Sequence, residues 1–145
     1  MNSKNPEILI ASDHAGFELK SHLIRQFPDL NWKDLGTHSI DSVDYPDYAS
    51  KLAEEIKKNG GGFGVLVCGS GQGMAIRANR YAHIRAALCW SEEIAGLARA
   101  HNDANVLCLP GRHIQAVLAD KILERFLQTP FEGGRHQKRV DKLKG

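Results

Sequence analysis

Short apolar runs alternate along the chain with longer segments in which apolar residues recur every three or four positions. Short runs bounded by glycine or polar residues are typical of buried strands, and the longer spacing is typical of amphipathic helices. The pattern predicts five strands, at residues 7–12, 31–35, 65–68, 85–89 and 106–109.

Helices are predicted between these strands. Leu19, Leu23 and Phe27 recur every four residues after the first strand, and Pro28 ends that helix. The same reasoning places further helices at residues 44–59, 74–80, from 91 onward and 114–128, and a last basic helix at about 135–144.

Strands and helices alternate without a repeat, a linker or a low-complexity segment. This order predicts a single α/β domain over residues 1–145, of three-layer Rossmann-like form, with a five-stranded parallel sheet and helices on both faces. Ligands bind at the carboxyl ends of the strands in such sheets. We therefore expect Asp13-His14, the turn after Cys68 and Gly111-Arg112 at one edge, and we expect the loop 101–105 to fold over that same edge.

The segment that opens with Val65 and runs to Gly73 indicates a buried strand, a tight turn and a helix start. Backbone N–H groups in such a turn have no intrahelical partner, so they can hold a phosphate or an oxyanion that forms during a reaction. Cys68 comes just before this turn, and an electropositive surrounding favours a thiolate. The pattern indicates a base that faces the charge it creates.

Other interpretations of this turn stay open at this point. The spacing of Gly69, Gly71 and Gly73 departs from G-x-G-x-x-G, and no Gly-Lys-Ser/Thr follows for a P-loop. Glu92 nevertheless lies roughly 20 residues further on, where a dinucleotide site carries an acidic residue. The turn could also be purely structural, or Cys68 could pair with His101 as in a cysteine protease.

Basic and polar residues elsewhere supply candidate ligands for a phosphate. Arg135 and Arg139 are four residues apart and so share a helix face. With Arg112 and His14 they could form a guanidinium clamp, although a solvated basic tail is the simpler alternative. Asp13-His14 could equally be a capped turn. His101-Asn102 is a candidate for proton transfer near neutral pH, or a plain histidine at a helix end.

Composition narrows the class of protein further. A net charge of +2 over 145 residues is too small to indicate a nucleic-acid partner, and no apolar run approaches the roughly 20 residues of a membrane span. The opening Met1–Pro6 lacks the apolar core of a secretory signal. Three cysteines without paired spacing predict a reducing, cytoplasmic location, and the lack of Cys-x-x-Cys or His-x-x-x-His predicts no metal site.

Together, several motifs resemble the type B ribose-5-phosphate isomerases, a family that includes the subunits of galactose-6-phosphate isomerase. The similarity covers nearly the whole chain in family-like order. The motifs are Ser12-Asp13-His14-Ala15-Gly16, Asp44-Tyr45-Pro46-Asp47-Tyr48-Ala49, Cys68-Gly69-Ser70-Gly71, Ala78-Asn79-Arg80, His101-Asn102-Asp103-Ala104-Asn105 and Phe131-Glu132-Gly133-Gly134-Arg135-His136.

The resemblance implies an aldose–ketose isomerase that interconverts ribose 5-phosphate and ribulose 5-phosphate without a metal or another cofactor. By that analogy Cys68 takes the proton next to the carbonyl, and His101 assists opening of the sugar ring. The implied substrate-binding residues are Asp13 and Asn102 for the hydroxyls, Gly69, Ser70, Gly71, Gln72 and Gly73 for the enediolate, and His14, Arg112, Arg135 and Arg139 for the phosphate.

Family members are dimers or tetramers, in which the tail arginines can reach a neighbouring subunit's site. Met74 stands where some members carry a glutamate base, which leaves Cys68 as the base of this turn, and Ser70 replaces a common Thr. Three questions stay open: whether the substrate is a pentose or a six-carbon allose or galactose phosphate, whether the oligomer is a homodimer or a homotetramer, and whether the clamp lies within one chain. A nucleotide-binding Rossmann-like module is the alternative from another class.

Overall fold

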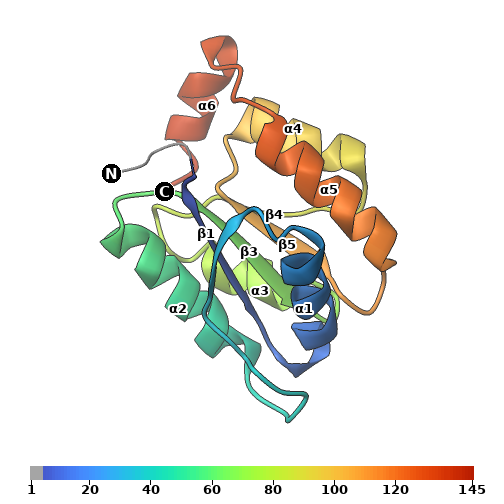
Figure 1. Ribbon diagram of the computed structural model, residues 1–145. Coiled ribbons are helices and arrows are strands. Elements are labelled where there is room, and N and C mark those ends of the chain that lie inside the picture. The colour runs from blue at the N-terminus through green and yellow to red at the C-terminus, as the bar shows by residue number, and fades with distance from the viewer. Residues whose placement is uncertain (1–4) are drawn as a thin grey trace.

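The sheet of the computed structural model has five parallel strands in the order β2-β1-β3-β5-β4 (Figure 1). The structure describes residues 5–145. The prediction that the opening residues lack a secretory signal therefore falls largely on Met1–Lys4, which lie outside the described residues. The strands are β1 Glu7–Ser12, β2 Asn31–Asp34, β3 Phe63–Cys68, β4 Ala86–Leu88 and β5 Val106–Pro110. The predicted parallel sheet is confirmed.

Helices cover both faces of this sheet. One face carries α1 (Phe17–Gln26), α4 (Glu92–Asn102) and α5 (Ala116–Gln128), and the other carries α2 (Tyr45–Lys58) and α3 (Gln72–Ala78) (Figure 1). Two short 3-10 turns, η1 (His14–Gly16) and η2 (Gly134–His136), and the tail helix α6 (Gln137–Asp141) complete the described chain. The three-layer α/β prediction is therefore confirmed.

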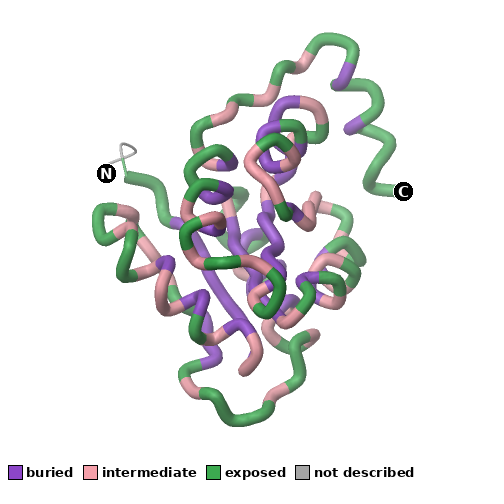
Figure 2. Tube along the Cα trace, turned by 90° about the vertical axis from the view of Figure 1, so that its right-hand side faces the viewer, coloured by how far each residue is buried: buried purple, intermediate pink, exposed green. Residues whose placement is uncertain are grey.

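Alternation along β3 explains why both faces need a cover. Val65 and Val67 pack into the core beneath α1, α4 and α5, whereas Leu66 and Cys68 pack into the core beneath α2 and α3. Successive side chains of a strand point to opposite faces, so a central strand that is apolar at every position must be buried on both. The buried stretches in Figure 2 accordingly follow the central strands.

Several element ends differ from the sequence pattern. Helix α3 begins at Gln72 rather than Met74, and α5 begins at Ala116 because Gln115 is still extended. The predicted basic helix of 135–144 is instead the turn η2 followed by a helix of five residues. Gly133 and Gly134, at the start of this tail, both have positive φ, which a regular right-handed helix does not contain.

The two edges of the sheet carry different segments. Cys68 of β3 pairs with Pro110 of β5 at the carboxyl edge, whereas the Gly64 N–H donates to the Asn105 carbonyl at the amino edge, at 3.0 Å. In Figure 1 the tail helix α6 lies at the top, beside the amino ends of the strands, and the starts of α2 and α3 lie near the opposite end.

This arrangement corrects one expectation. The loop 101–105 does not fold over the carboxyl edge of its own sheet. Helix α4 runs antiparallel to the strands, so its last residues and the loop that leads into β5 lie at the amino edge.

Within residues 5–145, none of the helices combines the length and the apolar character needed to cross a bilayer.

Candidate active site

A pocket of about 310 Å³ opens at the carboxyl edge of the sheet, where β1, β3 and β5 end. The structure brings seven of the predicted site residues together here, and it adds two that the sequence reasoning had not assigned to the site, Ala15 and Tyr45. The lining residues are Asp13, His14, Ala15, Tyr45, Cys68, Gly69, Ser70, Gly73 and Arg112. The motif Asp44-Tyr45-Pro46 was the available signal for Tyr45, which was interpreted as a helix start.

The turn after β3 is built from glycine for two different reasons. Gly71 has φ +75°, and a Cβ there would lie 2.5 Å from Leu88. A Cβ at Gly73 would lie 2.3 Å from the ring of Tyr45, so the glycine lets the ring pack directly on the turn. The left-handed conformation at Gly71 and the close contacts at both glycines make any larger residue unfavourable there.

Backbone donors of this turn lie at the pocket without internal partners, since Ser70 and Gly73 line it and Gly71 lies between them. The Ser70 Oγ accepts from the Gln72 N–H at 3.3 Å. In the described part of the chain, the N–H groups of Ser70, Gly71 and Gly73 have no hydrogen-bond acceptor. Unpaired amides beside a pocket are suited to a negatively charged oxygen.

The turn after β5 places Arg112 beside this cradle. The Gly111 N–H donates to the Cys68 carbonyl at 2.8 Å, and the Arg112 N–H donates to the Gly69 carbonyl at 3.0 Å. These two bonds join the ends of β3 and β5, so the Arg112 side chain lies next to Gly69. A guanidinium held at this place adds positive charge to the pocket.

Asp13 and His14 complete the pocket from the end of β1. The Asp13 carboxylate is buried and accepts the Gly16 N–H at 3.0 Å, so the capped-turn interpretation is correct for this residue. The His14 Nδ1 lies 3.2 Å from the Val43 N–H and accepts its hydrogen bond. A neutral imidazole with Nδ1 as acceptor carries its proton on Nε2, which leaves a donor for a substrate.

Cys68 differs from the other two cysteines in its surroundings. Burial raises the pKa of Cys89 to about 12 and the pKa of Cys108 well above its ordinary value, so both remain thiols in the core, as predicted. Cys68 is 5% exposed, and it lines the pocket while its backbone ends β3. Of the three cysteines, it is the one placed to meet a ligand.

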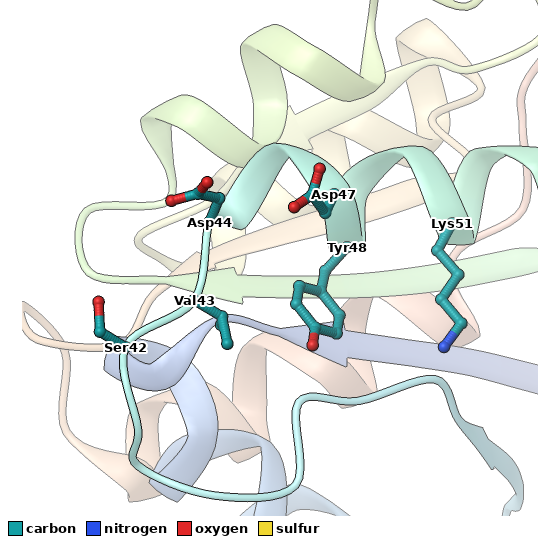
Figure 3. A pocket seen from close by; sticks show the side chains of 6 residues that line it. All are labelled: Ser42, Val43, Asp44, Asp47, Tyr48 and Lys51. Carbon is teal, nitrogen blue, oxygen red and sulfur yellow. The ribbon is translucent and has the colours of Figure 1, made fainter.

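A larger hollow of about 490 Å³ lies next to this pocket, between α2 and the loop before it (Figure 3). Tyr48 and Lys51 point from α2 toward that loop, whereas the carboxylates of Asp44 and Asp47 point to the other side. This hollow contains none of the predicted site residues. We place the site in the smaller pocket, because there a nucleophilic thiol meets free amides and a guanidinium.

The remaining predicted residues lie elsewhere. Gly71 is buried in the turn and Gln72 is exposed at the start of α3, and neither lines the pocket. Asn102 lines a separate hollow with Arg85 and Leu143 near the amino edge. Arg135 and Arg139 are exposed on the tail. His101, at the end of α4, also belongs to the amino edge.

His101 lies in a compact group at that edge. Its ring stacks on the ring of His136 with 4.3 Å between centroids and 13° between planes. The Glu132 Oε1 is 3.8 Å from the His101 Nε2 and 3.6 Å from the His136 Nε2. Sequence reasoning missed Glu132 and His136 as members of a site, although both lie in the quoted motif that ends at His136.

This group is the one described set of three side chains whose ligand atoms lie close enough together, within 4.8 Å, to suggest a metal ion. A metal binds a histidine along the lone pair in the plane of its ring. The two stacked planes are nearly parallel, so their lone pairs do not meet at one point unless a ring turns. The observed arrangement therefore favours ring-on-ring packing over metal coordination.

One chain thus carries two separated groups of candidate residues. The length of β5 between them is roughly 15 Å at about 3.3 Å per strand residue. A thiol beside unpaired amide donors, at the carboxyl edge of an α/β sheet, is suited to an enzyme whose substrate carries or develops negative charge.

Comparison with known proteins identifies the family. The ribose/galactose isomerase family matches residues 8–143. Ribose-5-phosphate isomerase B of Escherichia coli is 39% identical over 139 residues, which cover 94% of this chain and 93% of that protein. The crystal structure of a ribose 5-phosphate isomerase from Thermotoga maritima is 53% identical with a TM-score of 0.93, over 95% of this chain and 97% of that one.

A further solved structure contains a ligand. Ribose-5-phosphate isomerase B from Mycoplasma genitalium with bound ribulose-5-phosphate is 44% identical with a TM-score of 0.90, over 94% of this chain and 93% of that one. The chain belongs to the ribose/galactose isomerase family. It is an isomerase, as the resemblance of its motifs implied.

Proposed function

We propose that this isomerase interconverts ribose 5-phosphate and ribulose 5-phosphate through an enediolate, with Cys68 as the base. One observation carries the proposal: Cys68, Arg112 and two residues of the turn with unpaired amides, Ser70 and Gly73, line a single pocket. Membership of the family supports it, as does the bound ribulose-5-phosphate in the similar structure from Mycoplasma genitalium.

The chemistry follows from what the pocket offers. The Cys68 thiolate removes the proton from C2 of open-chain ribose 5-phosphate and returns one to C1, while the proton of the O2 hydroxyl passes to O1, so that C2 becomes the carbonyl carbon. The negative charge that develops on the carbonyl oxygen is held by the turn amides at Ser70, Gly71 and Gly73. A positioned base contributes roughly 10²–10⁴-fold to the rate, and each preorganised donor on the order of 10²–10³.

The phosphate binds away from the reacting carbons. The His14 Nε2–H and the Arg112 guanidinium are its anchors from this chain, and both already line the pocket. The Val43 N–H donates to the His14 ring and holds it in place, and the bond from the Arg112 N–H to the Gly69 carbonyl holds the backbone of Arg112. Binding energy at the phosphate then orients the sugar for proton transfer.

A second subunit supplies the other half of the site. His101, Asn102, Arg135 and Arg139 belong to the amino edge, so the pocket of one chain and the tail of a partner together complete the set. In this arrangement His101 assists ring opening, Asn102 and Asp13 bind sugar hydroxyls, and the two tail arginines close on the phosphate. A symmetric dimer, alone or within a tetramer, gives two such composite sites.

Isotope exchange tests the enediolate route. In deuterated water, wild-type enzyme should place deuterium at C1 of ribulose 5-phosphate and convert ribose 5-phosphate. Cys68→Ala should lower both rates by more than roughly 10²-fold with an unchanged fold, because the base is gone. Cys89→Ala is the matched control, since Cys89 is a core thiol, and should retain both activities. Exchange at the wild-type rate in Cys68→Ala would contradict the assignment.

A substrate panel fixes the length of the sugar. Ribose 5-phosphate should be turned over with a higher kcat/KM than allose 6-phosphate or galactose 6-phosphate. A preference for either six-carbon sugar would leave the Cys68 chemistry in place and reassign the substrate.

A further inference from the structure

We propose that His136 is a positioning residue for His101. His101 is the more exposed partner, with 37% of its side chain accessible, whereas the side chain of His136 is 11% accessible. The buried ring offers a flat, fixed surface to one face of the exposed ring, 4.3 Å away. This stack restricts the orientations that His101 can adopt before a substrate arrives.

The backbone around the pair explains why the buried ring is fixed. The Arg99 Nε donates to the Thr129 carbonyl at 3.2 Å, and the Glu132 N–H donates to the Ala100 carbonyl at 3.0 Å. Both bonds tie the segment before the tail to the last turn of α4, one or two residues from His101. Gly133, at φ +68°, then turns the chain so that His136 folds back onto that turn.

The contacts of His136 in residues 5–145 indicate no role other than packing on His101. Within residues 5–145 its Nε2 is buried and has no hydrogen-bond partner, with Glu132 just too distant at 3.6 Å. Burial, His101 and Arg135 lower the pKa of His136, so its ring stays neutral beside His101. A neutral ring can stack on His101 without repelling it when His101 gains a proton, and the Glu132 carboxylate lies at the Nε2 edge of both rings.

This inference rests on the proposed function, and sugar chemistry separates the two. Ribose 5-phosphate exists mainly as a closed ring, which must open before C2 can lose its proton. Ribulose 5-phosphate cannot close a five-membered ring, because its C5 oxygen carries the phosphate. Positioning of His101 should therefore matter for turnover of ribose 5-phosphate and not for exchange at C1 of ribulose 5-phosphate, which needs only Cys68 and the turn amides.

The test compares His136→Ala and His136→Phe with wild type. We expect His136→Ala to lower kcat for ribose 5-phosphate by roughly 10- to 100-fold, as loss of a support commonly does, with KM changed less than about threefold. Exchange at C1 of ribulose 5-phosphate should stay within about twofold of wild type. His136→Phe keeps a flat ring and should recover most of the lost kcat.

A matched control and the contrary outcomes complete the design. His22→Ala removes another imidazole that contacts a carboxylate, the one of Asp120 at 2.8 Å, and should change neither rate. The proposal is overturned if His136→Ala leaves kcat unchanged, or if exchange and turnover fall together. A raised KM for both sugars would likewise overturn it, because the role of His136 would then be to hold the arginine tail. If wild-type enzyme shows no exchange, the proposed function fails instead.

Discussion

At the scale of single residues, the three cysteines show how surroundings divide one residue type into two roles. Cys89 and Cys108 are enclosed by the core, and burial raises the pKa of both. Cys68 follows the same strand pattern but stands at its end, where the pocket begins. The surroundings of Cys68 differ because it ends a strand at the carboxyl edge, where parallel α/β sheets bind their ligands.

Alkylation should distinguish these cysteines. Iodoacetamide at pH 7.5 should modify Cys68 before Cys89 or Cys108, because a core thiol with a raised pKa forms little thiolate. Activity should be lost in proportion to the modified Cys68, and ribulose 5-phosphate should slow the loss. Peptide mapping by mass spectrometry measures the order. Equal labelling of Cys68 and Cys108 in the folded protein would contradict it.

His136 should make stability depend on pH. Its pKa is lowered in the folded chain by burial and by His101 and Arg135, so the unfolded chain binds the proton more readily. Its contribution to the free energy of unfolding is therefore complete above its ordinary pKa of 6.5 and is lost as the pH falls through the lowered folded value. Urea midpoints between pH 7.5 and 5 should fall more for wild type than for His136→Phe. Identical slopes would refute this sign.

At the scale of elements, the turn between β3 and α3 combines a structural and a chemical requirement. Gly71 needs the left-handed conformation, and its neighbours leave no room for a Cβ. The same turn leaves its amides free for a ligand. A change at this glycine should therefore reduce both stability and activity.

Two glycine substitutions separate these effects. Gly71→Ala should lower the free energy of unfolding by about 1–3 kcal/mol and reduce kcat, because it adds a clash with Leu88 to the backbone strain. Gly60→Ala is the matched control: φ is +77° there too, but a Cβ would meet nothing within 4 Å. It should cost about 1 kcal/mol and leave kcat unchanged. Denaturant titration and steady-state kinetics measure both, and equal effects of the two variants would contradict the role of the turn.

The elements were largely predictable from sequence, and the reason is physical. Strand β3 is apolar at consecutive positions because it is buried on both faces, and Leu19 and Leu23 recur at helical spacing because one side of α1 faces the core. The pocket residues from Asp13 to Arg112 were predictable because parallel strands all end at one edge. His136 and Glu132 were missed because local periodicity says nothing about a contact made across a turn at Gly133.

At the scale of the whole molecule, the two edges of the sheet carry two separate groups of candidate residues. The motif similarity grouped His101 with Cys68, but chain direction separates them, because α4 must run back to start β5. The composite site between two copies that we propose would reconcile the separated groups with one reaction. The cytoplasmic location and the number of subunits stay predictions.

The tail arginines should then act on substrate affinity. Arg135→Ala and Arg139→Ala should each raise KM for ribose 5-phosphate by roughly 10- to 100-fold, the effect of losing a charged hydrogen bond to phosphate, with a smaller change in kcat. Lys144→Ala, which removes another exposed charge of the tail, is the control and should leave KM unchanged. Unchanged KM in both arginine variants would remove the tail from the phosphate site.

Subunit mixing tests the central claim most directly, that a thiol from one chain and a histidine from another serve the same sugar. Cys68→Ala and His101→Ala proteins should each be nearly inactive alone. Unfolded together in equal amounts and refolded, they should regain about a quarter of wild-type activity, because half of the dimers are mixed and each mixed dimer holds one intact site. If the mixture stays as inactive as its parts, while refolded wild type is active, both groups must serve within one chain and the account is wrong.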